Sequence, residues 1–277
     1  MMAEGKLVVC ATPIGNLGDV TDRLRLALAD ADVIYAEDTR RTAKLLSHLG
    51  ISTPTRSLFV GNERSRTDDL VRDVDHGLVV ALVSDAGMPT VSDPGAAAVR
   101  EVRRSGHAVV VVPGPSAVTT AIALAGFDDD RFVFEGFLPR KGEARERRID
   151  DVASETRPVV LFASPKRLGV DLAELASRAP DREIAVIREM TKLHEEVWIG
   201  SVADAADHWG NLEVKGEITL VLGPGRPVIA TVRDAMAAAR AMIEEGESVS
   251  AAARRAASDS GVSRREVYQG LIDQDRN

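Results

Sequence analysis

Four glycine- and proline-rich turns are the segments of this sequence best placed to do chemistry, because each follows a short apolar run typical of a strand. They are residues 12–18, 84–95, 113–117 and 223–225. In a parallel sheet, ligands bind outside the carboxyl ends of the strands. Glycine lets the backbone approach a ligand closely, and proline keeps a turn rigid. Three such turns within the first 117 residues favour a cofactor cleft over three unrelated tight turns.

No familiar phosphate-binding motif identifies that cofactor. The first turn does not read GxGxxG and no segment matches GxxxxGK[ST], so neither a dinucleotide nor a triphosphate cradle is supported. Glu37 and Asp38 follow Gly15 by 22 and 23 residues, the spacing of the acid that holds a ribose in a dinucleotide-binding unit, but the matching glycines are missing. The sequence also lacks HExxH, GxSxG and paired Cys and His, which leaves a hydrolase little support.

Positive charge is concentrated at residues 138–148, which carry five basic and two acidic side chains in a chain of net charge −8. This stretch is a candidate phosphate contact. The alternative is a solvated helix face with Glu–Arg pairs at helical spacing, such as Glu143 and Arg147. Composition supports the two interpretations equally. A second polar cluster, residues 188–196, has mixed sign and could line a site or cap a sheet.

Short apolar runs alternate with helical patterns through the first 222 residues, which predicts an α/β fold. Near-continuous apolar runs at 78–83 and 108–112 are typical of strands buried on both faces of a mostly parallel sheet. Later runs are more closely spaced and predict a mixed sheet. The expected strands are residues 7–11, 33–36, 78–83, 108–112, 132–135, 159–162, 184–187, 196–199 and 218–222.

We expect two α/β domains, residues 1–127 and 128–224, followed by a helical tail, residues 225–277. The acidic run at 128–130 marks the first boundary, and Gly223-Pro224-Gly225 marks the second. The tail has an apolar helical stripe that begins at Ile229 and two short helices around Gly261, which resemble a helix-turn-helix. Residues 228–277 carry seven basic and eight acidic side chains, so we favour a cap on the main body over an RNA-binding element.

Composition excludes several classes of protein. With 44% hydrophobic and 28% charged residues the chain is typical of a folded protein, and no apolar run approaches the roughly 18 residues of a membrane span. The single Cys10 can form neither an internal disulfide nor a cysteine zinc cage, and Met1–Lys6 does not read as a secretion signal. We therefore expect a cytoplasmic protein without a metal site. The negative net charge, taken alone, argues against a nucleic-acid partner.

The motifs resemble a known family, the ribosomal RNA small subunit methyltransferase I group of the tetrapyrrole methylase superfamily. The resemblance covers about residues 6–222, and its motifs occur in family order at 12–17, 36–40, 84–87, 92–95, 113–117, 135–141, 188–192 and 215–217. It implies a two-domain tetrapyrrole-methylase-like fold and a homodimer. It also implies S-adenosylmethionine-dependent transfer of a methyl group to the ribose 2′-oxygen of a cytidine. That cytidine would lie in the decoding region of 16S rRNA, within the small ribosomal subunit.

The resemblance also implies positions for the site. Cofactor contacts from both domains would be Pro13, Ile14, Gly15, Asn16, Asp85, Ala86, Gly87, Met88, Pro89, Ser116, Ala117, Phe162, Glu217, Ile218 and Thr219. RNA contacts would be Arg140, Lys141, Arg145, Arg147 and Arg148. Met88 stands where the family usually has Thr, and Ala163 stands where it usually has Glu. No carboxylate role is therefore carried over to position 163.

Methyl transfer to a hydroxyl requires positioning and a group that accepts the proton. The candidates for that group are Glu37, Asp38, Asp85, Glu189 and Lys192, and the sequence does not choose among them. We expect Glu37 and Asp85 first of all to set the electrostatics of the cleft. Lys192 could act as a base if desolvation lowers its pKa, and an ion pair with Glu189 or Glu195 is the alternative. Two other functions remain open. One is an enzyme that methylates a ring carbon of a tetrapyrrole, and the other is a ribosome-binding module with a vestigial cleft that acts through the tail.

Overall fold

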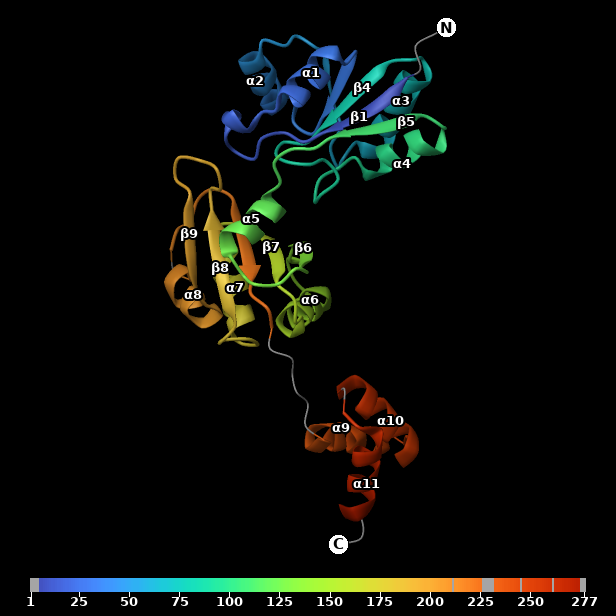
Figure 1. Ribbon diagram of the computed structural model, residues 1–277, viewed down its shortest axis with the longest axis vertical. Coiled ribbons are helices and arrows are strands. Elements are labelled where there is room, and N and C mark those ends of the chain that lie inside the picture. Colours follow the sequence, from blue (N-terminus) through green and yellow to red (C-terminus); the bar gives the residue numbers. More distant parts are fainter. Residues whose placement is uncertain (1–4, 211, 226–231, 245, 261, 275–277) are drawn as a thin grey trace. The chain divides into compact units, whose positions relative to one another are not determined.

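The chain divides into two compact units, Met1–Pro224 and Gly225–Asn277. The first unit contains two five-stranded sheets, and the second is helical (Figure 1). The predicted α/β fold class is therefore confirmed. The computed structural model describes residues 5–210, 212–225, 232–244, 246–260 and 262–274.

The first sheet is parallel throughout, as its continuous apolar runs predict, with the order β3-β2-β4-β1-β5. The sequence does not predict β3, because its residues Thr55, Arg56 and Ser57 form a short polar strand at the edge of the sheet. The strands are β1 (Lys6–Cys10), β2 (Val33–Ala36), β3 (Thr55–Ser57), β4 (Val79–Val83) and β5 (Ala108–Val112).

Four helices cover the two faces of this sheet (Figure 1). They are α1 (Asp22–Asp30) and α2 (Thr39–Leu49) on one face, and α3 (Glu63–Asp75) and α4 (Ala96–Arg104) on the other. In α2 the side chains of Thr42, Leu45 and Leu46 are buried, and Gly50 ends the helix with a left-handed φ of 67°. Because both faces are covered, the loops at the carboxyl ends of the strands remain to form a site.

The second sheet is mixed, as predicted, with the order β6-β7-β10-β8-β9. Only the β6–β7 pair is parallel, and the other three pairs are antiparallel. The strands are β6 (Val133–Phe137), β7 (Val159–Ala163), β8 (Glu183–Arg188), β9 (Glu196–Ser201) and β10 (Ile218–Leu222).

Helix α5 (Ala117–Ala125) covers one face of the second sheet, where Val118 and Ala121 pack in a cluster with Val160 and Ala185. The opposite face is covered by α6 (Glu143–Ser154), α7 (Leu168–Ala176) and α8 (Val202–Trp209). Although α5 precedes the expected boundary at residue 127, it packs on the second sheet. The turn at 113–116 therefore connects an edge strand of one sheet to a helix of the other.

The C-terminal unit consists of α9 (Val232–Glu244), α10 (Val249–Ser260) and α11 (Arg264–Gln274). Its core is rich in alanine and includes Ala235, Ala252 and Leu271. The expected positions Ile229 and Gly261 lie outside the described residues. In the part of the chain that the structure describes, no helix has the length and apolar character needed to cross a membrane.

Candidate active site at the carboxyl edge of the first sheet

The three predicted turns of the first sheet meet. Thr12 and Gly87 exchange backbone hydrogen bonds of 2.9 and 3.1 Å, which join the turns after β1 and β4. The turn after β5 lies equally close, because a Cβ on Gly114 would come within 3.0 Å of the Ala11 side chain. Gly87 has a φ of 79°, a left-handed conformation that favours glycine. The expected convergence of these turns is therefore present in the structure.

A cavity of about 350 Å³ opens where these turns face the second sheet. An adjoining groove shares Ile14, Asp85 and Glu217 with it. The predicted site residues that line the cavity are Ile14, Glu37, Asp85, Ala86, Gly87, Met88, Ser116, Ala117, Phe162, Glu217, Ile218 and Thr219. Pro13, Gly15 and Lys192 line the groove.

Two predicted cofactor contacts are not among the described residues that line the cavity or the groove. Pro89 lies on the loop after β4, beyond the lining residue Met88. The Asn16 side chain instead accepts a hydrogen bond of 2.9 Å from the Gly18 amide, which caps the short 3-10 helix Leu17–Asp19. Asn16 thus stabilises the first turn from outside the cavity.

Four acidic residues line the cavity: the predicted Glu37, Asp85 and Glu217, and Asp93, which the sequence analysis did not select. Burial, more than any other cause, raises the pKa of Glu37, and the charge of Asp85 adds to the effect. Burial also raises the pKa of Asp93 to about 6, and the charges of Glu37 and Asp85 act in the same direction. The motif Ser92-Asp93-Pro94-Gly95 was visible in the sequence, but only the fold shows that Asp93 reaches the cavity.

The loops around the cavity hold strained backbone. Among the described residues other than glycine, φ is positive at Thr90, Ser92, Glu189 and Thr191. Ser92 itself lines the cavity, and the other three lie within two residues of Met88, Met190 or Ser92, which also line it. Non-glycine residues adopt this conformation only where the surrounding structure imposes it, and such residues cluster at functional sites.

Lys192 forms ion pairs with Glu189 at 2.7 Å and with Glu217 at 3.0 Å. Burial acts to lower the pKa of Lys192, but the hydrogen bonds to these two carboxylates outweigh it, and the pKa is raised. A base role requires the opposite shift. The structure therefore favours the ion-pair alternative, with Glu217 as a second partner that the sequence analysis did not name.

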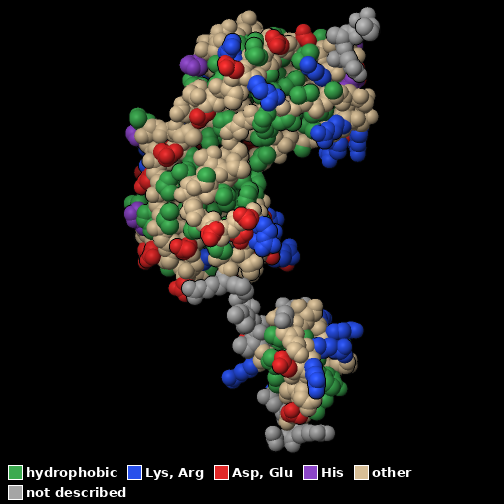
Figure 2. Space-filling view, in the orientation of Figure 1, with side chains coloured by type: hydrophobic (Ala, Val, Ile, Leu, Met, Phe, Trp, Pro, Cys, Tyr) green, Lys and Arg blue, Asp and Glu red, His purple; other side chains and the backbone are tan. Residues whose placement is uncertain are grey.

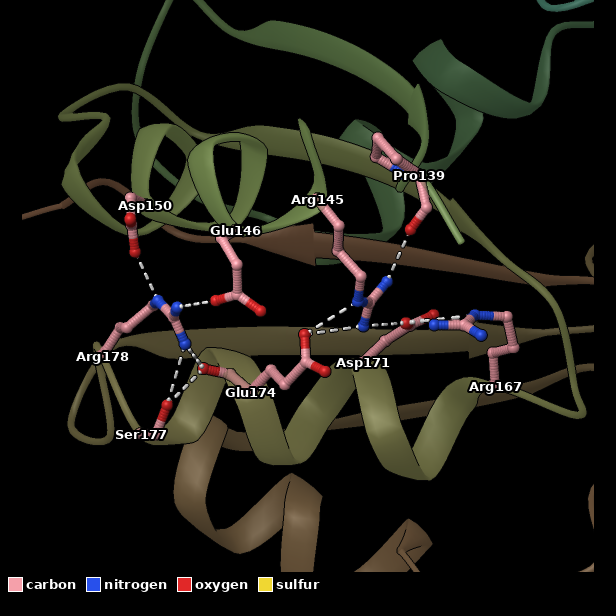
Figure 3. A network of polar contacts seen from close by, with 9 residues as sticks. All are labelled: Pro139, Arg145, Glu146, Asp150, Arg167, Asp171, Glu174, Ser177 and Arg178. Carbon is pink, nitrogen blue, oxygen red and sulfur yellow. Dashed lines mark hydrogen bonds and ion pairs between the residues drawn. The ribbon is translucent and has the colours of Figure 1, made fainter. Parts of the chain in front are cut away.

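The structure corrects the prediction that Arg145 contacts RNA. In α6 this residue lies one turn before the buried Ile149, so its side chain points into the protein and is 4% exposed. Its guanidinium donates hydrogen bonds to Asp171 at 2.8 Å, Glu174 at 2.9 Å and the Pro139 carbonyl at 3.0 Å (Figure 3). Each of its three nitrogens is engaged within the protein, and the buried guanidinium is not accessible to a phosphate.

The other predicted RNA contacts lie on the surface. Arg147 pairs with Glu143 at 2.8 Å, and Arg148 pairs with Glu135. Arg140 and Lys141 are exposed, and neither forms an ion pair with another residue in the described ranges. In Figure 2 acidic side chains are scattered over the visible face of the first unit, whereas basic ones gather in a few clusters. The net charge of −8 therefore averages over local positive surface.

Metal ligands do not gather at this site. No group of three or more His, Cys, Asp or Glu within the described ranges is arranged to hold a metal ion.

Comparison with known proteins places this architecture in a family. The sequence model of the Tetrapyrrole (Corrin/Porphyrin) Methylases matches residues 6–206. The chain is 46% identical to ribosomal RNA small subunit methyltransferase I of Thermotoga maritima over 79% of this chain and 98% of that protein. It is 40% identical to the protein of the same name from Mycobacterium tuberculosis H37Rv over 99% of this chain and 97% of that protein.

Solved structures support the same fold. Diphthine synthase superposes with a TM-score of 0.63 at 18% identity, covering 79% of this chain and 89% of that one. Uroporphyrin-III C-methyltransferase from Thermus thermophilus, in complex with S-adenyl homocysteine, superposes with a TM-score of 0.56 at 20% identity, covering 79% and 97%. From its motifs, its fold and these relatives, the chain belongs to the tetrapyrrole methylase family and, within it, to the ribosomal RNA small subunit methyltransferase I group.

Proposed function

We propose that this protein transfers a methyl group from S-adenosylmethionine to the ribose 2′-oxygen of a cytidine in the decoding region of 16S rRNA, within the small ribosomal subunit. The observation that carries the proposal is the cavity at the carboxyl edge of the first sheet, which combines a cluster of carboxylates with apolar walls. The relatives at 40–46% identity are named as methyltransferases of small-subunit ribosomal RNA, which supports this substrate.

The lining of the cavity suits S-adenosylmethionine. When bound, this cofactor supplies an electrophilic methyl group on a positively charged sulfur. Glu37 and Asp85 provide negative charge that complements a cation, and Ile14, Phe162 and Met190 provide apolar surface for its uncharged parts. Gly87 lines the cavity with a left-handed φ of 79°, a conformation that a residue with a side chain rarely adopts, so glycine sets the shape of this turn. The Thermus relative bound to S-adenyl homocysteine supports the same assignment.

Asp93 is the residue that accepts the proton of the ribose hydroxyl. Its carboxyl lines the cavity, and its pKa of about 6 leaves it ionised at neutral pH but more basic than an ordinary aspartate. A general base works best when its pKa lies close to the operating pH. Lys192, which the ion pairs hold in the charged form, fixes the Glu189 and Glu217 side chains instead.

The exposed basic residues Arg140 and Lys141 contact the phosphates of the RNA. They lie on the loop between β6 and α6, which follows the cavity residue Phe137 by only a few positions. A structured partner such as an assembled subunit can be recognised through shape and a few phosphate contacts. An acidic protein with a short basic loop is compatible with such a partner.

The protein acts as a homodimer in this proposal, and β5 supplies part of the interface. This strand is at an edge of the first sheet, and its Val110 and Val111 side chains are 42% and 45% exposed. An exposed apolar edge strand offers backbone groups and side chains with which a second chain can pair. Sedimentation equilibrium of the wild type and of Val110→Lys tests this part, and a monomeric wild type would contradict it.

Calorimetry with S-adenosylmethionine, followed by mapping of methylated riboses in 16S rRNA from a deletion strain with and without the gene restored, tests the proposal. We expect cofactor binding and one ribose methylation that depends on the gene. Absence of cofactor binding would reject the enzyme and leave the ribosome-binding module. A methylated base would reject the ribose target, and methylation of a tetrapyrrole instead of RNA would establish the small-molecule alternative.

A further inference from the structure

Phe137 is an aromatic side chain that the proposed chemistry does not use. It ends β6, lines the cavity and is 58% exposed. Its ring contacts Phe162 with a centroid separation of 5.5 Å and an interplanar angle of 59°. Phe162 in turn contacts Phe134 edge-on at 5.0 Å. Phe137 is therefore the outermost ring of a packed aromatic cluster, supported from beneath and open to solvent.

A β-bulge sets the orientation of the Phe137 ring. The pairing of β6 with β7 shifts register between Phe134 and Gly136, which places Phe137 opposite Phe162. Gly136 has a left-handed φ of 65°, which a residue with a side chain rarely adopts. Bulges of this kind occur beside active sites, where they redirect a side chain. Without the extra residue, the alternation of the strand would turn Phe137 to the other face of the sheet.

The bulge also lies close to the loop that carries the proposed proton acceptor. A Cβ on Gly136 would lie 3.0 Å from the Ser92 hydroxyl, so the end of β6 approaches the loop that carries Asp93. On the other side, Phe137 is followed within four residues by the exposed Arg140 and Lys141. One exposed aromatic face thus lines the same cavity as a carboxylate that can take a proton, and it is followed in the chain by a pair of cations that can hold phosphate.

We propose that the Phe137 face is a nucleobase subsite, on which the base of the target nucleotide stacks during methyl transfer. This inference rests on the proposed function, because it assigns a place to the nucleotide whose ribose reacts. Proteins that recognise single nucleotides in RNA stack the unpaired base on aromatic side chains. Stacking at Phe137 anchors the nucleotide by its base, while its ribose faces Asp93 and its phosphates face Arg140 and Lys141.

The other planar group that could stack at this cavity is the adenine of the cofactor. Phe162 is better placed for that group. It also lines the cavity, and its side chain is half-buried, whereas that of Phe137 is open to solvent. Phe137, at the exposed end of the cluster, is accessible to a ligand that arrives from solution. The two assignments predict different effects of the same substitution, since one affects the affinity for RNA and the other the affinity for the cofactor.

Three variants of the full chain test the subsite: Phe137→Ala, Phe137→Trp and the control Phe132→Ala. Phe132 is 38% exposed and precedes β6 at the opposite end of the strand from Phe137. For each variant we would measure kcat and KM with unmethylated small subunits, and the Kd for S-adenosylmethionine by calorimetry. We expect Phe137→Ala to lower kcat/KM by roughly 5- to 100-fold with an unchanged cofactor Kd, as loss of one stacked base predicts. Phe137→Trp should restore most of the activity, and Phe132→Ala should resemble the wild type.

Several outcomes would overturn the subsite. An active Phe137→Ala variant with wild-type kcat/KM would remove it, and so would an equal loss in Phe137→Trp. A cofactor Kd that weakens in Phe137→Ala while Phe137→Trp restores it would assign the ring to the adenine. Failure of the wild type to methylate ribose is a different result, because it rejects the proposed function before any variant is compared.

Discussion

Glu37 and Asp85 are linked by a reciprocal pair of hydrogen bonds between neighbouring loops. The Asp85 amide donates to the Glu37 carboxylate at 3.4 Å, and the amide of Asp38, the residue after Glu37, donates to the Asp85 carboxylate at 2.9 Å. Arg41 also pairs with Asp85 at 3.4 Å. Each loop thus holds the carboxylate of the other in place, so the two acids at the cavity form one unit.

Removal of the Asp85 carboxylate should therefore weaken cofactor binding more than the loss of one charge would. In Asp85→Ala the Asp38 amide loses its acceptor, and hydrogen bonds to charged groups are worth about 1.5–3 kcal/mol. We expect the Kd for S-adenosylmethionine, measured by calorimetry, to rise by at least about tenfold. Asp85→Asn keeps an acceptor oxygen and should lose less, while the exposed Asp22→Ala on α1 serves as the control. Equal affinities for Asp85→Ala and Asp22→Ala would contradict this role.

The raised pKa of Asp93 predicts how activity depends on pH. The base must be ionised, so kcat/KM should rise as pH increases through about 6 and then level off, in line with the pKa of the carboxyl. Asp93→Asn removes the proton acceptor and should lower kcat by about 10²- to 10⁴-fold with little change in cofactor Kd. A pH profile that stays flat through this range, or an active Asn variant, would exclude Asp93 as the base.

The same pKa predicts an effect on stability of opposite sign to that on activity. The Asp93 carboxyl titrates near 6 in the folded state and near its ordinary 3.8 when unfolded, so its stabilising contribution is complete below 3.8 and is lost as pH rises through 6. Asp93→Asn should therefore unfold at a higher temperature than the wild type at about pH 7.5, and the difference should vanish near pH 4. Thermal melts of both proteins at the two pH values measure it, and a variant that melts lower at neutral pH would contradict the shift.

Arg145 should matter for stability and not for RNA binding. Its buried guanidinium pairs with Asp171. Burial raises the pKa of the Asp171 carboxyl, Arg145 acts to lower it, and the net shift is upward. Arg145→Ala would leave the buried Asp171 carboxylate with only the longer 3.8 Å contact to Arg167, and removal of one partner of a buried ion pair typically costs about 3–5 kcal/mol. The exposed Arg147→Ala, at the end of a surface pair, should cost less than about 1 kcal/mol. Denaturant unfolding of the two variants measures this difference in the free energy of unfolding. Equal stabilities would contradict the structural role of Arg145.

The loop residues Arg140 and Lys141 should act on RNA alone. The double variant Arg140→Ala/Lys141→Ala should raise KM for small subunits and reduce the slope of log affinity against log salt by roughly two. The affinity for the cofactor should not change. The matched control is Arg23→Ala/Arg25→Ala, two exposed arginines of α1. A salt slope that changes equally in both double variants would show that the effect is one of net charge.

The sequence predicts the strands well because strands buried in a parallel or mixed sheet have apolar sequences. Nine of the ten strands coincide with predicted apolar runs. It fails at β3, whose three polar residues have no apolar face. It also misassigns Arg145, because a count of charges does not show which side of a helix faces the protein. Arg145 shares the inward side of α6 with Ile149, a relation that is clear only once the helix is packed.

The site is predicted in part for a similar reason. The turns that carry Ile14, Asp85 and Ser116 can be predicted from their glycine and proline residues, and all three residues line the cavity. The role of Asp93 cannot be predicted in this way, because its raised pKa comes from burial beside Glu37 and not from a local sequence motif. Contacts between the two sheets, such as that of Gly136 with Ser92, join residues far apart in the chain and leave no periodic signal in the sequence.

The buried cysteine has a practical consequence for studying this enzyme. Cys10 is the only cysteine of the chain, its side chain is fully buried in β1, and burial raises the pKa of its thiol to about 12. Reactivity requires the thiolate, so maleimide reagents should leave the wild type unmodified under native conditions. A cysteine introduced on the β6–α6 loop or in the C-terminal helices would then carry a fluorophore alone, which makes the natural sequence a ready background for single-site labelling.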